Sequence, residues 1–87
     1  MYVIVVYDVQ ADRTQKMLKI CRRYLNWIQN STLEGELTQL QLDELVDAAL
    51  KVMDPTTDSL ILFKNRNAAW LEKEIVGVEK GSTDQFL

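Results

Sequence analysis

The first nine residues, MYVIVVYDV, restrict the fold of this chain more than any other feature. Valine, isoleucine and tyrosine favour extended backbone, and Asp8 is the only charged residue among them. The run therefore predicts a strand over residues 2–9 that is covered on both faces. One strand cannot bury itself, so the rest of the 87 residues must supply a sheet and the layers that cover it.

A first amphipathic helix is predicted after this strand. Asp12, followed by Gln15 three residues later, has the spacing of a capping box, so the helix should begin there. At helical spacing one side of the helix is apolar, with the residues Met17, Cys21, Tyr24, Leu25 and Ile28.

A second helix should begin at another capping box, Thr38 with Gln41, and end at Asp54 and Pro55. Its predicted buried face consists of Leu42, Leu45, Val46, Ala49 and Met53.

Further strands are expected between and after the helices. Residues 27–37 suggest one strand, or two short strands kinked near Glu34 and Gly35. Residues 58–64 and 70–78 suggest two more strands. Residues 79–87 are expected to contain a turn and, as an option, a C-terminal edge strand over 85–87.

The order of these elements predicts one α+β domain over residues 1–87, a ferredoxin-like antiparallel sheet with two helices on one face. No third helix is available for the other face. A second copy of the chain is the expected cover, which makes the predicted protein a homodimer.

Composition excludes several kinds of site. The chain has no histidine and one cysteine, Cys21, so it has no His-dependent catalytic triad, no His/Cys zinc site and no intrachain disulfide. A bound metal would need oxygen ligands, which favours Mg²⁺ or Mn²⁺. No apolar run approaches 18 residues and no basic segment precedes the first strand. We therefore expect no membrane partner and a cytoplasmic location.

Asp8, at the end of the first strand, is the main candidate for catalysis and for metal binding. It could also be an ordinary turn residue that follows a strand. The pair Glu34 and Glu36 would share one face of a strand, as a second acidic site or, the favoured interpretation, as a solvated edge. Tyr7 should face the core. Trp27 and Trp70 should pack in the core or at the dimer interface, in preference to stacking on bases.

Half of the ten basic residues are concentrated around the first predicted helix, at Arg13, Lys16, Lys19, Arg22 and Arg23. A charged helix face is often only solvated. However, none of these residues has an acidic partner four positions further along the helix, and the chain carries a net charge of −3. Contact with nucleic-acid phosphates explains the clustering better, with Arg13, Lys16, Lys19 and Arg23 as the candidates.

Three segments, YDV, WIQNSTLEGELT and TDSLILF, resemble the small CRISPR-associated adaptation nuclease, the second core Cas protein. The resemblance extends over nearly the whole chain. It implies a ferredoxin-like homodimer in which Asp8 of each copy lies near the dimer axis and shares Mg²⁺ or Mn²⁺. It also implies an endonuclease that binds duplex DNA, possibly with single-stranded RNA as another substrate, and that bridges the CRISPR integrase during spacer acquisition.

Two alternatives stay open beside a metal-dependent phosphodiesterase. The chain could be a catalytically silent DNA-binding scaffold, in which Asp8 has no chemical role. It could also be a stand-alone ribonuclease toxin of the virulence-associated type, which shares the ferredoxin-like fold.

Overall fold

The computed structural model describes residues 1–67, 72 and 74–81. Their elements, in chain order, are β1 (Tyr2–Asp8), the 3-10 turn η1 (Ala11–Arg13), α1 (Thr14–Arg22), β2 (Asn26–Gln29), β3 (Thr32–Glu36), α2 (Gln39–Val52) and β4 (Ser59–Asn65). The strands form one antiparallel sheet in the order β2-β3-β1-β4. The predicted ferredoxin-like α+β fold is therefore confirmed. No described helix is long and apolar enough to cross a membrane.

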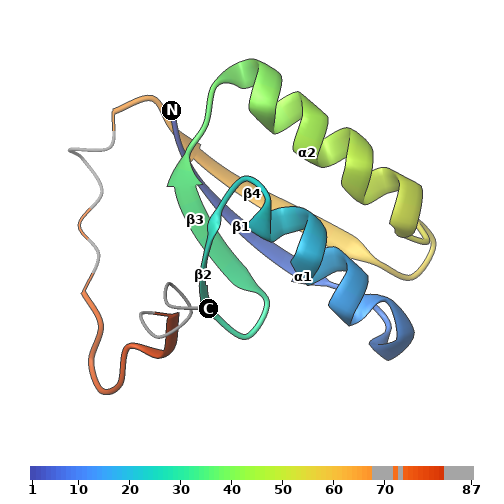
Figure 1. Ribbon diagram of the computed structural model, residues 1–87, viewed down its shortest axis with the longest axis horizontal. Helices are drawn as coiled ribbons and strands as arrows, with labels where there is room; N and C mark the ends of the chain where they lie inside the picture. The colour runs from blue at the N-terminus through green and yellow to red at the C-terminus, as the bar shows by residue number, and fades with distance from the viewer. Residues whose placement is uncertain (68–71, 73, 82–87) are drawn as a thin grey trace.

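Both helices cover the same face of the sheet (Figure 1). β1 lies between β3 and β4, and its side chains alternate between the two faces. Val3, Val5 and Tyr7 point under the helices and are buried, as predicted for Tyr7. They join a core made of Met17, Ile20, Cys21, Leu25, Leu33, Leu37, Leu42, Leu45 and Ala49.

The predicted start of the first helix is wrong. Asp12 lies in η1 and caps nothing, and α1 begins only at Thr14. The Thr14 hydroxyl donates a hydrogen bond to the backbone carbonyl of Gln10, and Asp12 lies 3.5 Å from the Arg13 guanidinium. These local bonds replace the capping box.

The helix is also shorter than predicted. α1 ends at Arg22, so Tyr24 and Leu25 belong to the connection and Ile28 to β2. Leu25 still packs in the core from this connection.

The segment 27–37 forms the second of the two predicted alternatives, a pair of strands, but they meet at a different place. The turn between β2 and β3 is Asn30–Ser31, and Asn30 has a positive φ of 46°. Asparagine tolerates this left-handed conformation, which two-residue hairpins favour. Gly35 instead lies inside β3, where an added Cβ would approach the Leu25 side chain to 3.1 Å. Its small size serves packing and makes no kink.

The segment from Thr38 to the end of β4 folds nearly as predicted. Thr38 and Gln41 form the complete capping box of α2. The helix ends at Val52, and Leu42, Leu45 and Ala49 are its buried residues. β4 occupies residues 59–65, one position later than expected.

The predicted strand over residues 70–78 is wrong in its described part, since residues 72 and 74–78 form no strand. The rest of that prediction, and the edge strand over residues 85–87, fall outside the described residues. The segment 74–81 runs along the side of the sheet opposite the helices (Figure 1).

Candidate functional site

Asp8 is the last residue of β1 and is exposed. It shares its face of the strand with Ile4 and Val6, since Val5 and Tyr7 point to the helices. Its neighbour across the ladder is Ser59, the first residue of β4. The sheet thus presents the carboxylate at one end of the face that carries no helix.

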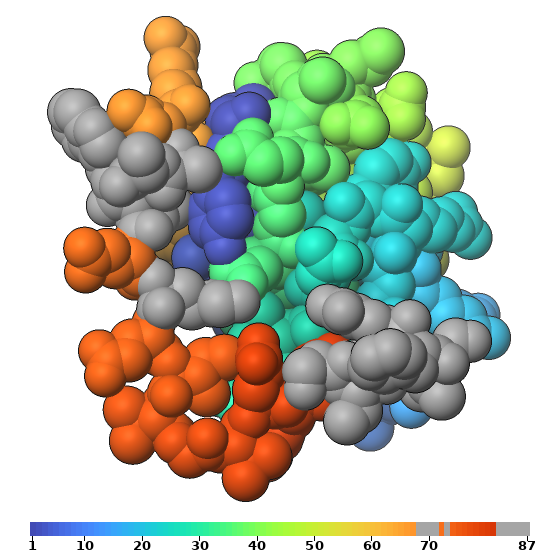
Figure 2. Space-filling view, turned by 60° about the vertical axis from the view of Figure 1, so that its left-hand side comes forward, coloured from blue at the N-terminus to red at the C-terminus, as the bar shows by residue number. Residues whose placement is uncertain are grey.

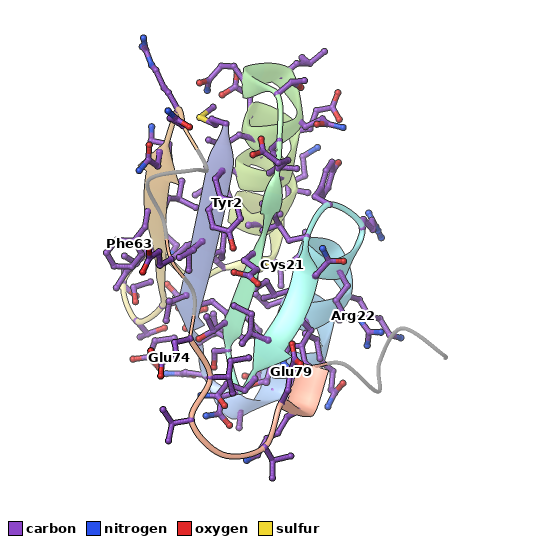
Figure 3. The ribbon with its side chains drawn as sticks, turned by 90° about the vertical axis from the view of Figure 1, so that its left-hand side faces the viewer. Tyr2, Cys21, Arg22, Phe63, Glu74 and Glu79 are labelled. Atoms are coloured by element: carbon purple, nitrogen blue, oxygen red, sulfur yellow. The ribbon has the colours of Figure 1, made fainter. Side chains whose placement is uncertain are left out.

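An apolar patch lies on the same face, next to Asp8 along the strands. We define the open-face patch as Ile4, Val6, Ile61 and Phe63; Ile61 pairs with Val6 and Phe63 with Ile4. Ile61 and Phe63 remain 49% and 56% exposed. Figure 3 views this face, with Phe63 on β4 and Tyr2 on β1. Exposed apolar patches of this kind are typical of protein–protein interfaces.

The opposite half of the face is covered by the chain itself. Residues 74–81 lie over β2 and β3 and leave a groove of about 420 Å³ whose lining on the sheet includes Tyr2, Ile28 and Thr32. Ile4 of the open-face patch also borders this groove. In Figure 2 this segment forms the orange and red wall of the groove. Its end lies tight against β2, because a Cβ on Gly81 would stand 2.1 Å from the Trp27 carbonyl oxygen. The expectation that only a second copy covers this face is therefore wrong for the β2–β3 half.

Glu34 and Glu36 share a face of β3, as predicted, but Glu34 is no solvated residue. β3 lies inside the sheet, Glu34 is only 9% exposed, and the Tyr2 hydroxyl donates a hydrogen bond to its carboxylate. Burial and, secondarily, this bond to Glu34 raise the pKa of Tyr2. Glu36 instead lies 3.3 Å from the N-terminal ammonium group. Each carboxylate therefore has a local partner at the end of β1 remote from Asp8.

The exposed face of α1 is basic. Met17, Ile20 and Cys21 turn inward, whereas the side chains turned to solvent include Lys16, Lys19, Arg22 and Arg23. Arg22 projects from α1 in Figure 3. The predicted phosphate-binding residues Lys16, Lys19 and Arg23 therefore lie on an accessible surface.

Arg13 has a different environment from these residues. It precedes α1, and its side chain is 19% exposed. Its Nε donates to Asp58 Oδ2 at 2.6 Å and its Nη2 to Asp58 Oδ1 at 3.0 Å. The grouping of Arg13 with the phosphate-binding residues is corrected on this ground, because its guanidinium is held by a carboxylate of the chain.

Asp58 is the residue that sequence reasoning missed. Its side chain is fully buried, yet both carboxylate oxygens accept hydrogen bonds from Arg13. They also accept from the backbone N–H groups of Gln10 and Asp54, at 3.1 and 2.9 Å. The hydrogen bonds from Arg13 hold the pKa of Asp58 well below its usual range. The sequence offers one sign of this role, an aspartate directly before an apolar strand. It does not reveal the partner, because Arg13 is 45 residues away in sequence.

The remaining candidates have structural environments. Cys21 is fully buried, and burial raises the pKa of its thiol to about 11, so it stays protonated and unreactive at neutral pH. Trp27 packs against the core, as expected, and its indole N–H donates to the Asn30 carbonyl. Trp70 lies outside the described residues.

A divalent cation fits Asp8 only in part. The carboxylate is a hard oxygen ligand that solvent can reach, which suits Mg²⁺. Across the described residues, no three acidic or cysteine side chains gather closely enough to hold a metal ion. One copy of the chain thus brings a single acidic ligand to the end of β1.

Known proteins resemble this chain in sequence and in fold. The family CRISPR associated protein Cas2 matches residues 1–73. A CRISPR-associated endoribonuclease Cas2 from Fusobacterium nucleatum is 44% identical over 92 residues, which cover 100% of this chain and 87% of that protein. The protein of the same name from Dictyoglomus turgidum is 41% identical, with both chains covered in full.

Solved structures give the same result. A crystal structure of cas2 has 38% sequence identity and a TM-score of 0.78, covering 92% of this chain and 90% of that one. Streptococcus pyogenes Cas2 at pH 6.5, at 24% identity, shares the fold with a TM-score of 0.73 over 87% of this chain and 100% of the other. With a family match over most of its length and full-length relatives above 40% identity, this chain belongs to the Cas2 family of CRISPR-associated proteins.

Proposed function

We propose that this chain is a cytoplasmic, metal-dependent endonuclease of CRISPR adaptation that acts as a homodimer. The observation that carries the proposal is the position of Asp8, exposed at the end of β1 on the same face as the open-face patch. The shared name of the relatives, CRISPR-associated endoribonuclease, supports cleavage of a phosphodiester bond, with single-stranded RNA as the first substrate to test.

A second copy completes the acidic site in this proposal. Dimers pair the same patch on both subunits about a two-fold axis. In the proposed dimer this axis passes near the end of β1, next to the open-face patch, so that the two copies of Asp8 meet there. Two carboxylates resist sharing a small space unless a cation lies between them. Mg²⁺ or Mn²⁺ bound there would supply a Lewis acid that lowers the pKa of a water and offsets charge on the phosphate.

Binding of duplex DNA is proposed for the basic face of α1. Lys16 and Lys19 are exposed on α1, and Arg23 is exposed directly after its last residue. Their charge contrasts with the net charge of −3 for the whole chain. Such local positive charge attracts the phosphate backbone without reading sequence. In the dimer two such faces would hold a duplex while the protein bridges the CRISPR integrase.

The decisive experiment compares wild-type protein with Asp8→Asn. Asparagine keeps the size and polarity of the side chain but removes both charges from the dimer. We expect it to abolish cleavage that EDTA inhibits, and also the rise in melting temperature that Mg²⁺ produces in wild-type protein. Dimerisation and duplex binding should persist, which light scattering and a gel-shift assay would check.

The same comparison tests the scaffold hypothesis, which the exposed basic face of α1 also supports. If purified wild-type protein cleaves neither single-stranded RNA nor duplex DNA with Mg²⁺ or Mn²⁺, but binds duplex DNA, the protein is a scaffold and the proposed catalysis is wrong. If Asp8→Asn cleaves at the wild-type rate, Asp8 is not the metal ligand.

A further inference from the structure

The buried ion pair of Arg13 and Asp58 lies next to the end of β1. Asp58 immediately precedes Ser59, the ladder partner of Asp8. One of the further donors to its carboxylate is the N–H of Gln10, two residues after Asp8. The segment that follows β1 and the segment that precedes β4 are therefore both held by the carboxylate of Asp58.

The geometry of the pair is that of a rigid fork. Nε and Nη2 of Arg13 each reach a different oxygen of Asp58, at 2.6 and 3.0 Å, and Nη2 also reaches the Thr57 hydroxyl at 3.3 Å. Bidentate pairs of this kind fix orientation as well as charge. The Asp54 N–H, which donates to the same carboxylate, extends the connection to the chain that follows α2.

From this arrangement we infer that Arg13 and Asp58 are positioning residues, which hold Asp8 in place for the metal site. This inference rests on the proposed function. Without the pair, Asp8 keeps its ladder partner Ser59, and Val9 keeps its packing against the core. Gln10, however, loses the hydrogen bond that ties it to the residue before β4. The strand would then fray from its end, and the carboxylate would sample many orientations. Arg13 also directly precedes α1, so its bond to Asp58 fixes where the basic face begins relative to Asp8.

The test compares Asp58→Asn and Arg13→Lys with a control, Thr38→Ala. Lysine keeps the positive charge of Arg13 but cannot make its two parallel hydrogen bonds, so this variant separates the effect of geometry from that of charge. Arg13→Lys also provides the test if Asp58→Asn does not fold. Thr38→Ala removes the capping box at the other end of α2 and destabilises the fold without touching this region. A merely structural role would give all three variants the same behaviour at equal loss of melting temperature.

Two measurements decide the inference. The backbone ¹⁵N order parameters of Asp8 and Val9 should fall from about 0.85 toward 0.6 in Asp58→Asn and Arg13→Lys, and stay unchanged in Thr38→Ala. The affinity of the dimer for Mn²⁺ alone, measured by calorimetry, should fall at least about tenfold in the first two variants only, as expected when residues that orient a ligand are lost.

The outcomes separate this inference from the proposed function. Unchanged order parameters at Asp8 in both pair variants overturn the inference, whatever metal the wild-type protein binds. If the wild-type dimer binds no Mn²⁺, the proposed metal site is wrong, and the order parameters still decide whether the pair holds Asp8. Equal losses in Thr38→Ala would show that global stability, not local positioning, controls the end of β1.

Discussion

Asp58 shows how one buried carboxylate can organise several segments of a small protein. Its side chain is inaccessible to solvent and accepts hydrogen bonds from Arg13, Gln10 and Asp54. A buried charge is tolerated when it is paired and fully hydrogen-bonded, and breaking one partner is costly. Asp58 should therefore contribute to stability only in its ionised form.

The pH dependence of stability follows from the direction of the pKa shift. The hydrogen bonds from Arg13 lower the pKa of folded Asp58 below its ordinary value of 3.8. Its contribution is therefore complete above pH 4 to 5 and is lost as pH falls through that range toward the folded pKa. Urea unfolding should show wild-type protein more stable than Asp58→Asn at pH 7, with the difference shrinking from pH 5 to pH 3. A difference that stays constant down to pH 3 would contradict the assigned ionisation.

The candidate site was predictable at Asp8 but not at its supporting pair. Asp8 stands out because a carboxylate closes an apolar strand, a pattern within nine residues. Arg13 and Asp58 are 45 residues apart, and each alone looks like an ordinary charged residue. Only the antiparallel pairing of β1 with β4 brings their segments together. That pairing is a tertiary feature that local periodicity does not contain.

At the scale of elements, the sequence predicted α2 and β1 well because local signals agree with the fold there. The capping box at Thr38 and the alternation along β1 favour locally the same structure that the folded protein adopts. The β2–β3 hairpin differs from the prediction, because a glycine commonly marks a bend and Gly35 does not bend the chain here. Its role is to make room for Leu25, which depends on a contact between elements. Asn30, the residue that makes the turn, is a weaker turn signal in the sequence than a glycine.

The exposed face of α1 gives a prediction at this scale. If Lys16 and Lys19 contact phosphates, replacing both by alanine should weaken binding to every duplex sequence. It should also reduce the slope of log affinity against log salt concentration by about 1.8, since each lost phosphate contact changes it by about 0.9. Lys51→Ala is the matched control, because Lys51 is exposed on α2 and pairs with Asp47. An unchanged slope in the double variant would mean that the face is merely solvated.

At the scale of the whole molecule, the two faces of the sheet differ in how completely they are covered. The helices bury one face, whereas the other is covered by residues 74–81 only over its β2–β3 half. Ile61 and Phe63 on β4 remain about half exposed. An 87-residue domain buries a limited share of its surface, so leaving such side chains in water is a substantial loss that a second copy can recover.

The proposed homodimer is tested most directly at Phe63. Aspartate there places a charge on the open-face patch, and the two-fold axis duplicates it, so the interface should be lost. The side chain is already 56% exposed, so the monomer should still fold, which circular dichroism would confirm. Light scattering at micromolar concentration should give about 10.1 kDa for Phe63→Asp and about twice that mass for wild-type protein. Leu50→Asp is the control, because Leu50 is 57% exposed but lies on α2, away from the patch.

Loss of the dimer should also remove the metal response, because each copy supplies one Asp8. Phe63→Asp should therefore show no Mg²⁺-dependent rise in melting temperature, although its own Asp8 is intact. Leu50→Asp should keep both the dimer and the response. If Phe63→Asp remains a dimer, the open-face patch is not the interface. If it is a monomer that Mg²⁺ still stabilises as in wild-type protein, the metal binds within one copy and the shared site at the two-fold axis is wrong.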